Sequence, residues 1–183
     1  MADERLHANK PGGADDGYQQ LRRVAALGYQ LRAALVASDR FLAHDDAADR
    51  ETAGWLVSCG LGLAQEVTAD IDGLAKTWKP KASEPGLGQA MHQLRIRAHQ
   101  LQAATKAADH FLDQDSSEDQ ANGSWLVACA LGLADKLAGE AEDLASAVKR
   151  GNSEAANAAT PDVAARRAAA AAAAAVRGAT TVQ

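Results

Sequence analysis

The sequence predicts an all-α protein, a four-helix up-down-up-down bundle made of two tandem, duplicated αα-hairpins. The first observation is a repeat: residues 55–64 (WLVSCGLGLA) return 70 positions later as 125–134 (WLVACALGLA). The same offset aligns residues 24–79 with 94–149, and about 21 of the 56 aligned pairs are identical. The second is composition, which is 47% hydrophobic but only 4% aromatic. Ala and Leu supply most of the apolar residues, which is typical of packed helices.

The repeat also sets the predicted boundaries. They are a disordered lead-in over 1–17, a first hairpin over 18–79, a linker over 80–88, a second hairpin over 89–150 and an Ala-rich flexible tail over 151–183. The linker contains Pro and Gly, which tend to end a helix. Neither hairpin can bury an apolar stripe alone, so the two are expected to pack on each other or on another subunit.

Helices are predicted over about 18–43, 48–78, 89–113 and 117–149, because apolar residues recur there at steps of three and four. The first stripe is Leu21, Val24, Leu27, Leu31, Leu35, Ser38 and Leu42. The second is Leu56, Cys59, Leu63, Val67, Ile71, Leu74 and Trp78, and the fourth has its equivalents from Leu126 to Val148. The third is weaker: Leu94, Leu101, Thr105, Ala108 and Leu112. Ser117 and Gln120 have capping-box spacing at the start of the fourth helix.

Charge and targeting signals limit the classes of partner. The formal net charge is −5, and residues 150–183 are net basic, so the rest is more acidic still. An acidic body argues against nucleic-acid binding, because such binding needs clustered Lys and Arg. The start lacks the apolar core of a signal peptide, and no apolar run reaches the length of a membrane span. A cytoplasmic protein without membrane contact is therefore expected.

Three tryptophans are candidate functional residues. Trp55 and Trp125 begin equivalent helices, near Phe41 and Phe111 at the ends of the preceding ones. The favoured interpretation is an aromatic lid over each end of the core. The alternative is an aromatic pocket or an exposed contact for another protein. Trp78 has no aromatic counterpart in the second repeat, where Val148 stands, and is the better candidate for an asymmetric surface function.

Small residues and cysteines accompany the tryptophans. Gly62 and Gly132 each lie one turn after a small residue, and Gly within a helix costs about 1 kcal/mol relative to Ala. We expect close approach of a neighbouring helix there; a groove for a ligand or partner helix is the alternative. Cys59 and Cys129 are expected in the core. If the two lay close together they would form a redox-responsive pair, but a square bundle would separate them on a diagonal.

A basic surface is a further candidate, formed by Arg22, Arg23, Arg95 and Arg97. These arginines begin the first and third helices, where the helix dipole does not favour positive charge. An acidic partner is one interpretation. Ion pairs with nearby carboxylates such as Asp72 and Glu140, on a solvated face, are the preferred one.

The motifs of common enzymes are missing from the sequence. It has no Gly-rich phosphate loop, nucleophile elbow or Cys-x-x-Cys, and its one Glu-x-x-His spacing, Glu4 to His7, lies in the predicted lead-in. We therefore predict no enzyme activity, no catalytic residue, no cofactor and no bound metal. The leading hypothesis is a bacterial-type interaction or regulatory module that binds an unidentified protein partner or forms a homodimer. The alternatives are a small apolar-ligand-binding bundle and the Cys59–Cys129 redox-responsive bundle.

Overall fold

The computed structural model describes residues 14–44, 46–78, 85–114 and 116–159. Within these residues the chain forms four α-helices and no strand. They are α1 (Ala14–Leu42), α2 (Ala47–Thr77), α3 (Pro85–Leu112) and α4 (Ser117–Ala159). The prediction of an all-α, four-helix protein is confirmed. No helix in the described part is long and apolar enough to cross a bilayer.

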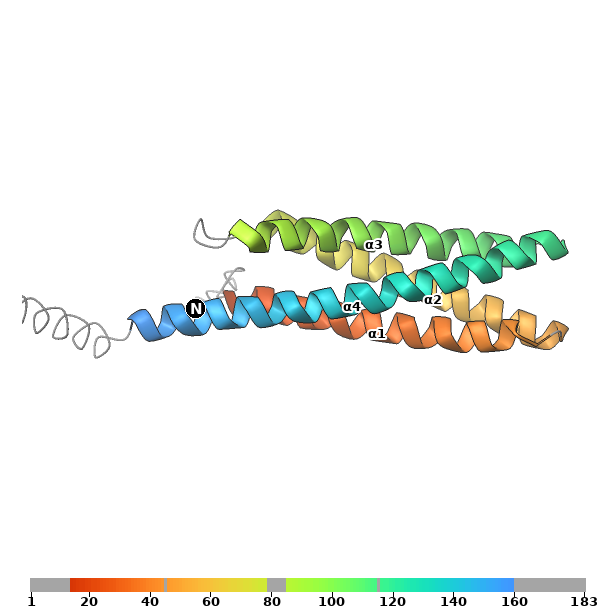
Figure 1. The fold of residues 1–183 in the computed structure, drawn as a ribbon, viewed down its shortest axis with the longest axis horizontal. Helices are drawn as coiled ribbons and strands as arrows, with labels where there is room; N and C mark the ends of the chain where they lie inside the picture. Colours follow the sequence, from red (N-terminus) through yellow and green to blue (C-terminus); the bar gives the residue numbers. More distant parts are fainter. Residues whose placement is uncertain (1–13, 45, 79–84, 115, 160–183) are drawn as a thin grey trace, which may run out of the picture.

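The helices pack side by side along the long axis of the molecule (Figure 1). α1 contacts α2 and α4, and α3 contacts the same two helices. The view in Figure 1 places α4 in front and α2 behind. α2 and α4 therefore lie across the bundle from each other, and each has an outward side that neither α1 nor α3 covers.

The helix ends differ from the predicted boundaries. α1 begins at Ala14, inside the predicted lead-in, and α3 begins at Pro85, inside the predicted linker. Proline suits the first turn of a helix, because its missing N–H would have no partner there and its φ is already helical. α4 continues to Ala159, into the predicted tail. The other residues of the predicted lead-in, linker and tail lie outside the described residues.

Capping side chains start two of the helices. The Asp46 carboxylate accepts a 2.9 Å hydrogen bond from the backbone N–H of Ala48 at the start of α2. At the start of α4, the Ser116 hydroxyl accepts from the N–H of Asp119 at 3.0 Å and donates to the Asp119 carboxylate at 2.5 Å. The helix is therefore capped by Ser116 and Asp119, one residue before the predicted capping box of Ser117 and Gln120.

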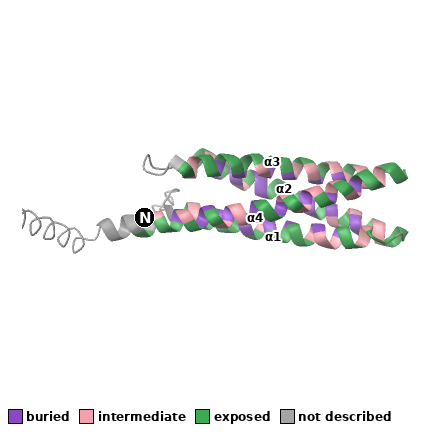
Figure 2. Cartoon of the chain, viewed as in Figure 1, coloured by how far each residue is buried: buried purple, intermediate pink, exposed green. Residues whose placement is uncertain are grey.

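The predicted stripe of α2 is wrong in its first half. The buried positions are Ala53, Val57, Gly60, Ala64, Val67, Thr68, Ile71 and Leu74. Leu56 and Leu63 are only partly buried, and Cys59 is exposed. α4 shows the same pattern: Val127, Ala130 and Ala134 are buried in place of Leu126, Cys129 and Leu133. Figure 2 shows how buried and exposed positions alternate along each helix.

Small residues occupy the true stripe because bulky residues of the facing helix fill the space. A Cβ on Gly60 would lie 3.1 Å from Leu31 Cδ1. A Cβ on Gly28 of α1 would lie 3.1 Å from the Cβ of Ala138 and 3.3 Å from its Cα. The stripes of α1 and α3 were largely predicted correctly, since Leu21, Leu31, Leu35, Leu94 and Leu101 are fully buried.

Three polar side chains lie in this core and all have hydrogen-bond partners. Ser38 of α1 donates to the carbonyl of Ala53 in α2 at 3.1 Å. Thr68 and Thr105 donate to carbonyls of their own helices, at 2.8 and 2.9 Å. Because buried hydroxyls are costly only when unpaired, these three are compatible with a stable core.

Candidate interaction faces

Two outward-facing tryptophans are the most unusual feature of the surface. Trp55 of α2 and Trp125 of α4 are each 67% exposed. The predicted aromatic lid is therefore wrong: neither indole covers the core. The reason is the register of the true stripe, which buries Ala53 and Val57 and turns Trp55 to the outside. Large exposed aromatics are typical of contact surfaces, because Trp contributes much of the binding energy where it is buried by a partner.

Gly62 and Gly132 lie two turns after these tryptophans, on the same outward sides. Both are exposed, and a Cβ added at either would meet nothing within 4 Å. The predicted close approach of a neighbouring helix is wrong for these two glycines. Packing within the described bundle therefore does not explain why glycine, which lowers helix stability relative to alanine, occupies these two positions.

The cysteines complete two equivalent surfaces. Cys59 is exposed and Cys129 is partly buried, so their expected place in the core is wrong. We call Trp55, Cys59 and Gly62 the α2 face, and their counterparts Trp125, Cys129 and Gly132 the α4 face. Both thiols are free, and they lie on helices that face each other across the bundle, an arrangement that does not favour the Cα separation of about 4.4–6.8 Å that a disulfide needs.

The residues that flank the two faces differ in charge. On α2, Glu51 and Glu66 lie one turn before Trp55 and one turn after Gly62. The equivalent residues on α4 are Ala121 and Lys136. All four are exposed. The two faces thus share their central residues but present different electrostatics to a partner.

Trp78 lies in a different setting. It follows the last residue of α2, and its backbone N–H donates to the carbonyl of Leu74 at 2.8 Å. Its side chain is partly buried against the core. Trp78 therefore belongs to the packing at the end of α2 and not to the α2 face.

The four arginines of the predicted basic surface are all engaged within the bundle. Arg23 of α1 pairs with Glu66 and, at 3.1 Å, with Asp70 of α2. The other three pairs are Arg22–Glu142 at 3.8 Å, Arg95–Asp72 at 2.6 Å and Arg97–Glu140 at 2.8 Å. These pairs connect neighbouring helices, so the arginines fix how the helices align and offer little net positive charge to an acidic partner.

Asp72 of α2 contacts two side chains of α3. Its Oδ1 accepts from Arg95 Nε at 2.6 Å and lies 3.4 Å from His99 Nε2. The hydrogen bond from Arg95 and the nearby positive charge hold the pKa of Asp72 below its ordinary value. The sequence placed Asp72 among the neutralising carboxylates, but its two partners on α3 became visible only in the packed bundle.

A shallow depression of about 380 Å³ lies elsewhere on α4, lined by Ser146, Lys149, Arg150 and Ser153. At 1.5 Å per residue, Ser146 is about 30 Å along the helix from Trp125. The depression is therefore separate from the α4 face. The hypothesis of an apolar-ligand pocket assumed a core capped by tryptophan, and the exposure of both indoles removes that cap.

Within the described ranges, no group of three or more His, Cys, Asp or Glu side chains is arranged to hold a metal ion. Comparison of the chain with protein-family models, with curated proteins and with solved structures finds no match. The geometry of the two faces is therefore the basis for a functional proposal.

Proposed function

We propose that this chain is a non-enzymatic interaction module that binds other proteins through the α2 and α4 faces. The observation that carries the proposal is the pair Trp55 and Trp125, which occupy equivalent positions and are both 67% exposed. Exposed indole surface is costly in water, and its burial in a partner would recover that cost. Gly62 and Gly132 support the same proposal, because each leaves open space two turns from a tryptophan on the same side of the helix, where a partner could pack closely.

We interpret the bundle as two duplicated αα-hairpins in up-down-up-down order, which gives the two faces a common origin. The 70-residue offset relates every residue of one face to a residue of the other. It also relates Arg50 to Gln120, and Arg50 Nη1 donates to Gln120 Oε1 at 3.1 Å. A contact between equivalent positions is expected where a pseudo-two-fold axis passes between the two hairpins.

The proposal is tested by affinity capture with the immobilised chain from an extract of its source cells. Trp55→Ala and Trp125→Ala, singly and together, are expected to reduce the amount of specific partner retained. The matched control is Ile96→Ala, which removes another exposed apolar side chain outside both faces. Retention of the same proteins by the double variant and by the wild type would contradict the proposal. Circular dichroism of each variant verifies that the helices remain folded.

A further inference from the structure

We infer that the α4 face binds the α4 face of a second copy of this chain, in an antiparallel pairing that seats each Trp125 over Gly132 of the other copy. This inference rests on the proposed function and names the partner of one of its two faces. The α4 face differs from the α2 face in its flanking charges, and that difference decides the partner.

The spacing within the face makes it self-complementary. Trp125 and Gly132 are separated by two helical turns, about 10 Å along α4. Two copies of α4 can lie antiparallel, with a two-fold axis that passes between Ala128 and Cys129. In this single alignment each Trp125 lies opposite Gly132 of the other copy. Gly132 has open space where a Cβ would be. It therefore leaves room for the indole without any rearrangement of the bundle.

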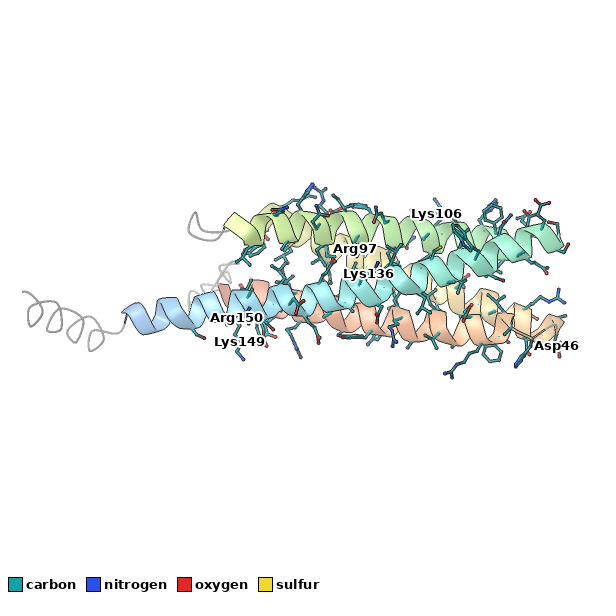
Figure 3. All side chains as sticks on the ribbon, viewed as in Figure 1. Asp46, Arg97, Lys106, Lys136, Lys149 and Arg150 are labelled. Atoms are coloured by element: carbon teal, nitrogen blue, oxygen red, sulfur yellow. The ribbon has the colours of Figure 1, made fainter. Side chains whose placement is uncertain are left out.

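The flanking charges favour this pairing. In the same register Lys136 lies opposite Ala121 of the second copy, with Glu118 of that copy one turn away. Lys136 lies on α4, as labelled in Figure 3. Neither Lys136 nor Glu118 forms an ion pair with another side chain among the described residues. Two symmetric Lys136–Glu118 pairs between copies would therefore compete with no pair seen within the chain.

The α2 face lacks this complementarity. In an equivalent antiparallel pairing of two α2 helices, Glu51 would lie opposite Glu66 of the other copy at both ends of the contact. Glu66 is already paired with Arg23 of its own chain, so this pairing would bring acidic groups together and form no new ion pair between copies. A mixed pairing of the α2 face with the α4 face of a second copy would form the Glu51–Lys136 pair only once. It would also leave one face of each copy unpaired, so further copies would add and form an open chain. The pairing of α4 with α4 closes as a dimer and keeps the α2 face available for another protein.

Sedimentation velocity of the purified, reduced protein over a range of concentrations tests the inference. The expected result is a reversible dimer whose dissociation constant rises about tenfold or more in Gly132→Leu. The matched control, Gly62→Leu, makes the same change on the α2 face and is expected to leave the dimer intact. Both positions have open space in the monomer, so both variants should fold. A monomer at every concentration, an open-ended chain, or a dimer lost in Gly62→Leu but kept in Gly132→Leu would overturn the inference.

A charge exchange tests the register. Lys136→Glu is expected to weaken the dimer, and adding Glu118→Lys to that variant should restore it by reversing both pairs. Absence of rescue, with both variants folded, would overturn the antiparallel register. A monomeric result would not affect the capture of partners through Trp55, which separates failure of this inference from failure of the proposed function.

Thiol cross-linking gives an independent readout. In the inferred dimer the two Cys129 residues lie near the two-fold axis, whereas the Cys59 residues lie on the far sides. A short bismaleimide should therefore link Cys59→Ser chains through Cys129 and fail to link Cys129→Ser chains. Random collisions would give the opposite preference, because Cys59 is the more exposed thiol in one chain. That opposite preference would overturn the inference.

Discussion

Individual glycines have opposite roles in these helices, depending on what their missing Cβ would meet. At Gly28 it would meet the Cα of Ala138 at 3.3 Å, so the glycine allows a close contact between α1 and α4. At Gly62 it would meet nothing within 4 Å. Glycine destabilises a helix interior relative to alanine through backbone entropy and helix propensity. Gly28 is therefore explained by packing within the chain, whereas nothing within the described bundle packs against the outward side of Gly62.

The same substitution should consequently have opposite effects at the two positions. Gly62→Ala is expected to raise the free energy of unfolding by about 0.5–1 kcal/mol, because it improves helix propensity without a steric cost. Gly28→Ala is expected to lower it by about 1–3 kcal/mol, because the Ala138 backbone cannot move aside easily. Urea denaturation measures both. Destabilisation by Gly62→Ala would show that its outward side is covered within the chain.

Pairs of helices are aligned by ion pairs at their edges as well as by the core. α2 and α3 are joined by Asp72, which interacts with Arg95 and His99, and by the Ser58 hydroxyl, which donates to Asp109. α1 and α4 are joined by Arg32–Asp135 at 2.9 Å. Such exposed pairs each contribute little energy. Their main effect is to favour one alignment of neighbouring helices, since the apolar surfaces that pack together consist largely of Ala and Leu.

The contribution of the α2–α3 contact to stability should decrease at acid pH, because it includes the charged carboxylate of Asp72. Its pKa in the folded protein lies below the ordinary value of 3.8, so the carboxylate stabilises the fold above about pH 4, and this contribution is lost as the pH falls through the folded pKa. Asp72→Asn is expected to cost about 0.5–1 kcal/mol at pH 7 and less at pH 2, because the carboxylate loses its charge as the pH falls through its lowered folded pKa. Asp143→Asn, which removes an exposed carboxylate of α4, is the control. An equal cost of Asp72→Asn at both pH values would contradict the role of its charge.

The whole molecule is held together by contacts between the first and last helices. α1 packs on α4 as well as on α2, and α3 packs on α2 as well as on α4. The buried residues of all four helices form one continuous core cluster. α1 with α2 alone, or α3 with α4 alone, would expose to water the core residues that the other two helices cover, which favours a single cooperative unit over two independent ones.

Separated hairpins should therefore fold only together. Fragments 14–78 and 85–159 are expected to show weak helicity alone and to regain it when mixed at equal concentration. Circular dichroism at 222 nm measures the recovery, and the intact chain provides the reference. A fragment that melts cooperatively by itself would contradict the single-core description. If one hairpin formed a homodimer instead, sedimentation would reveal it before mixing.

The sequence by itself determined the fold class, because steps of three and four between apolar residues, few aromatics and a 70-residue repeat leave little besides packed helices. The sequence also identified Trp55, Gly62 and their counterparts in the second repeat as candidate functional residues. It could not decide which side of α2 is buried: Leu56 and Leu63 form a stripe as regular as the true one through Val57, Gly60 and Ala64. Only the tertiary structure decided that, because Leu31 and Leu35 of α1 fill the space beside Gly60. A small residue is favourable in a core when its neighbours are large, and this complementarity is invisible within one helix. The same choice of register turned the tryptophans outward and made them candidates for binding.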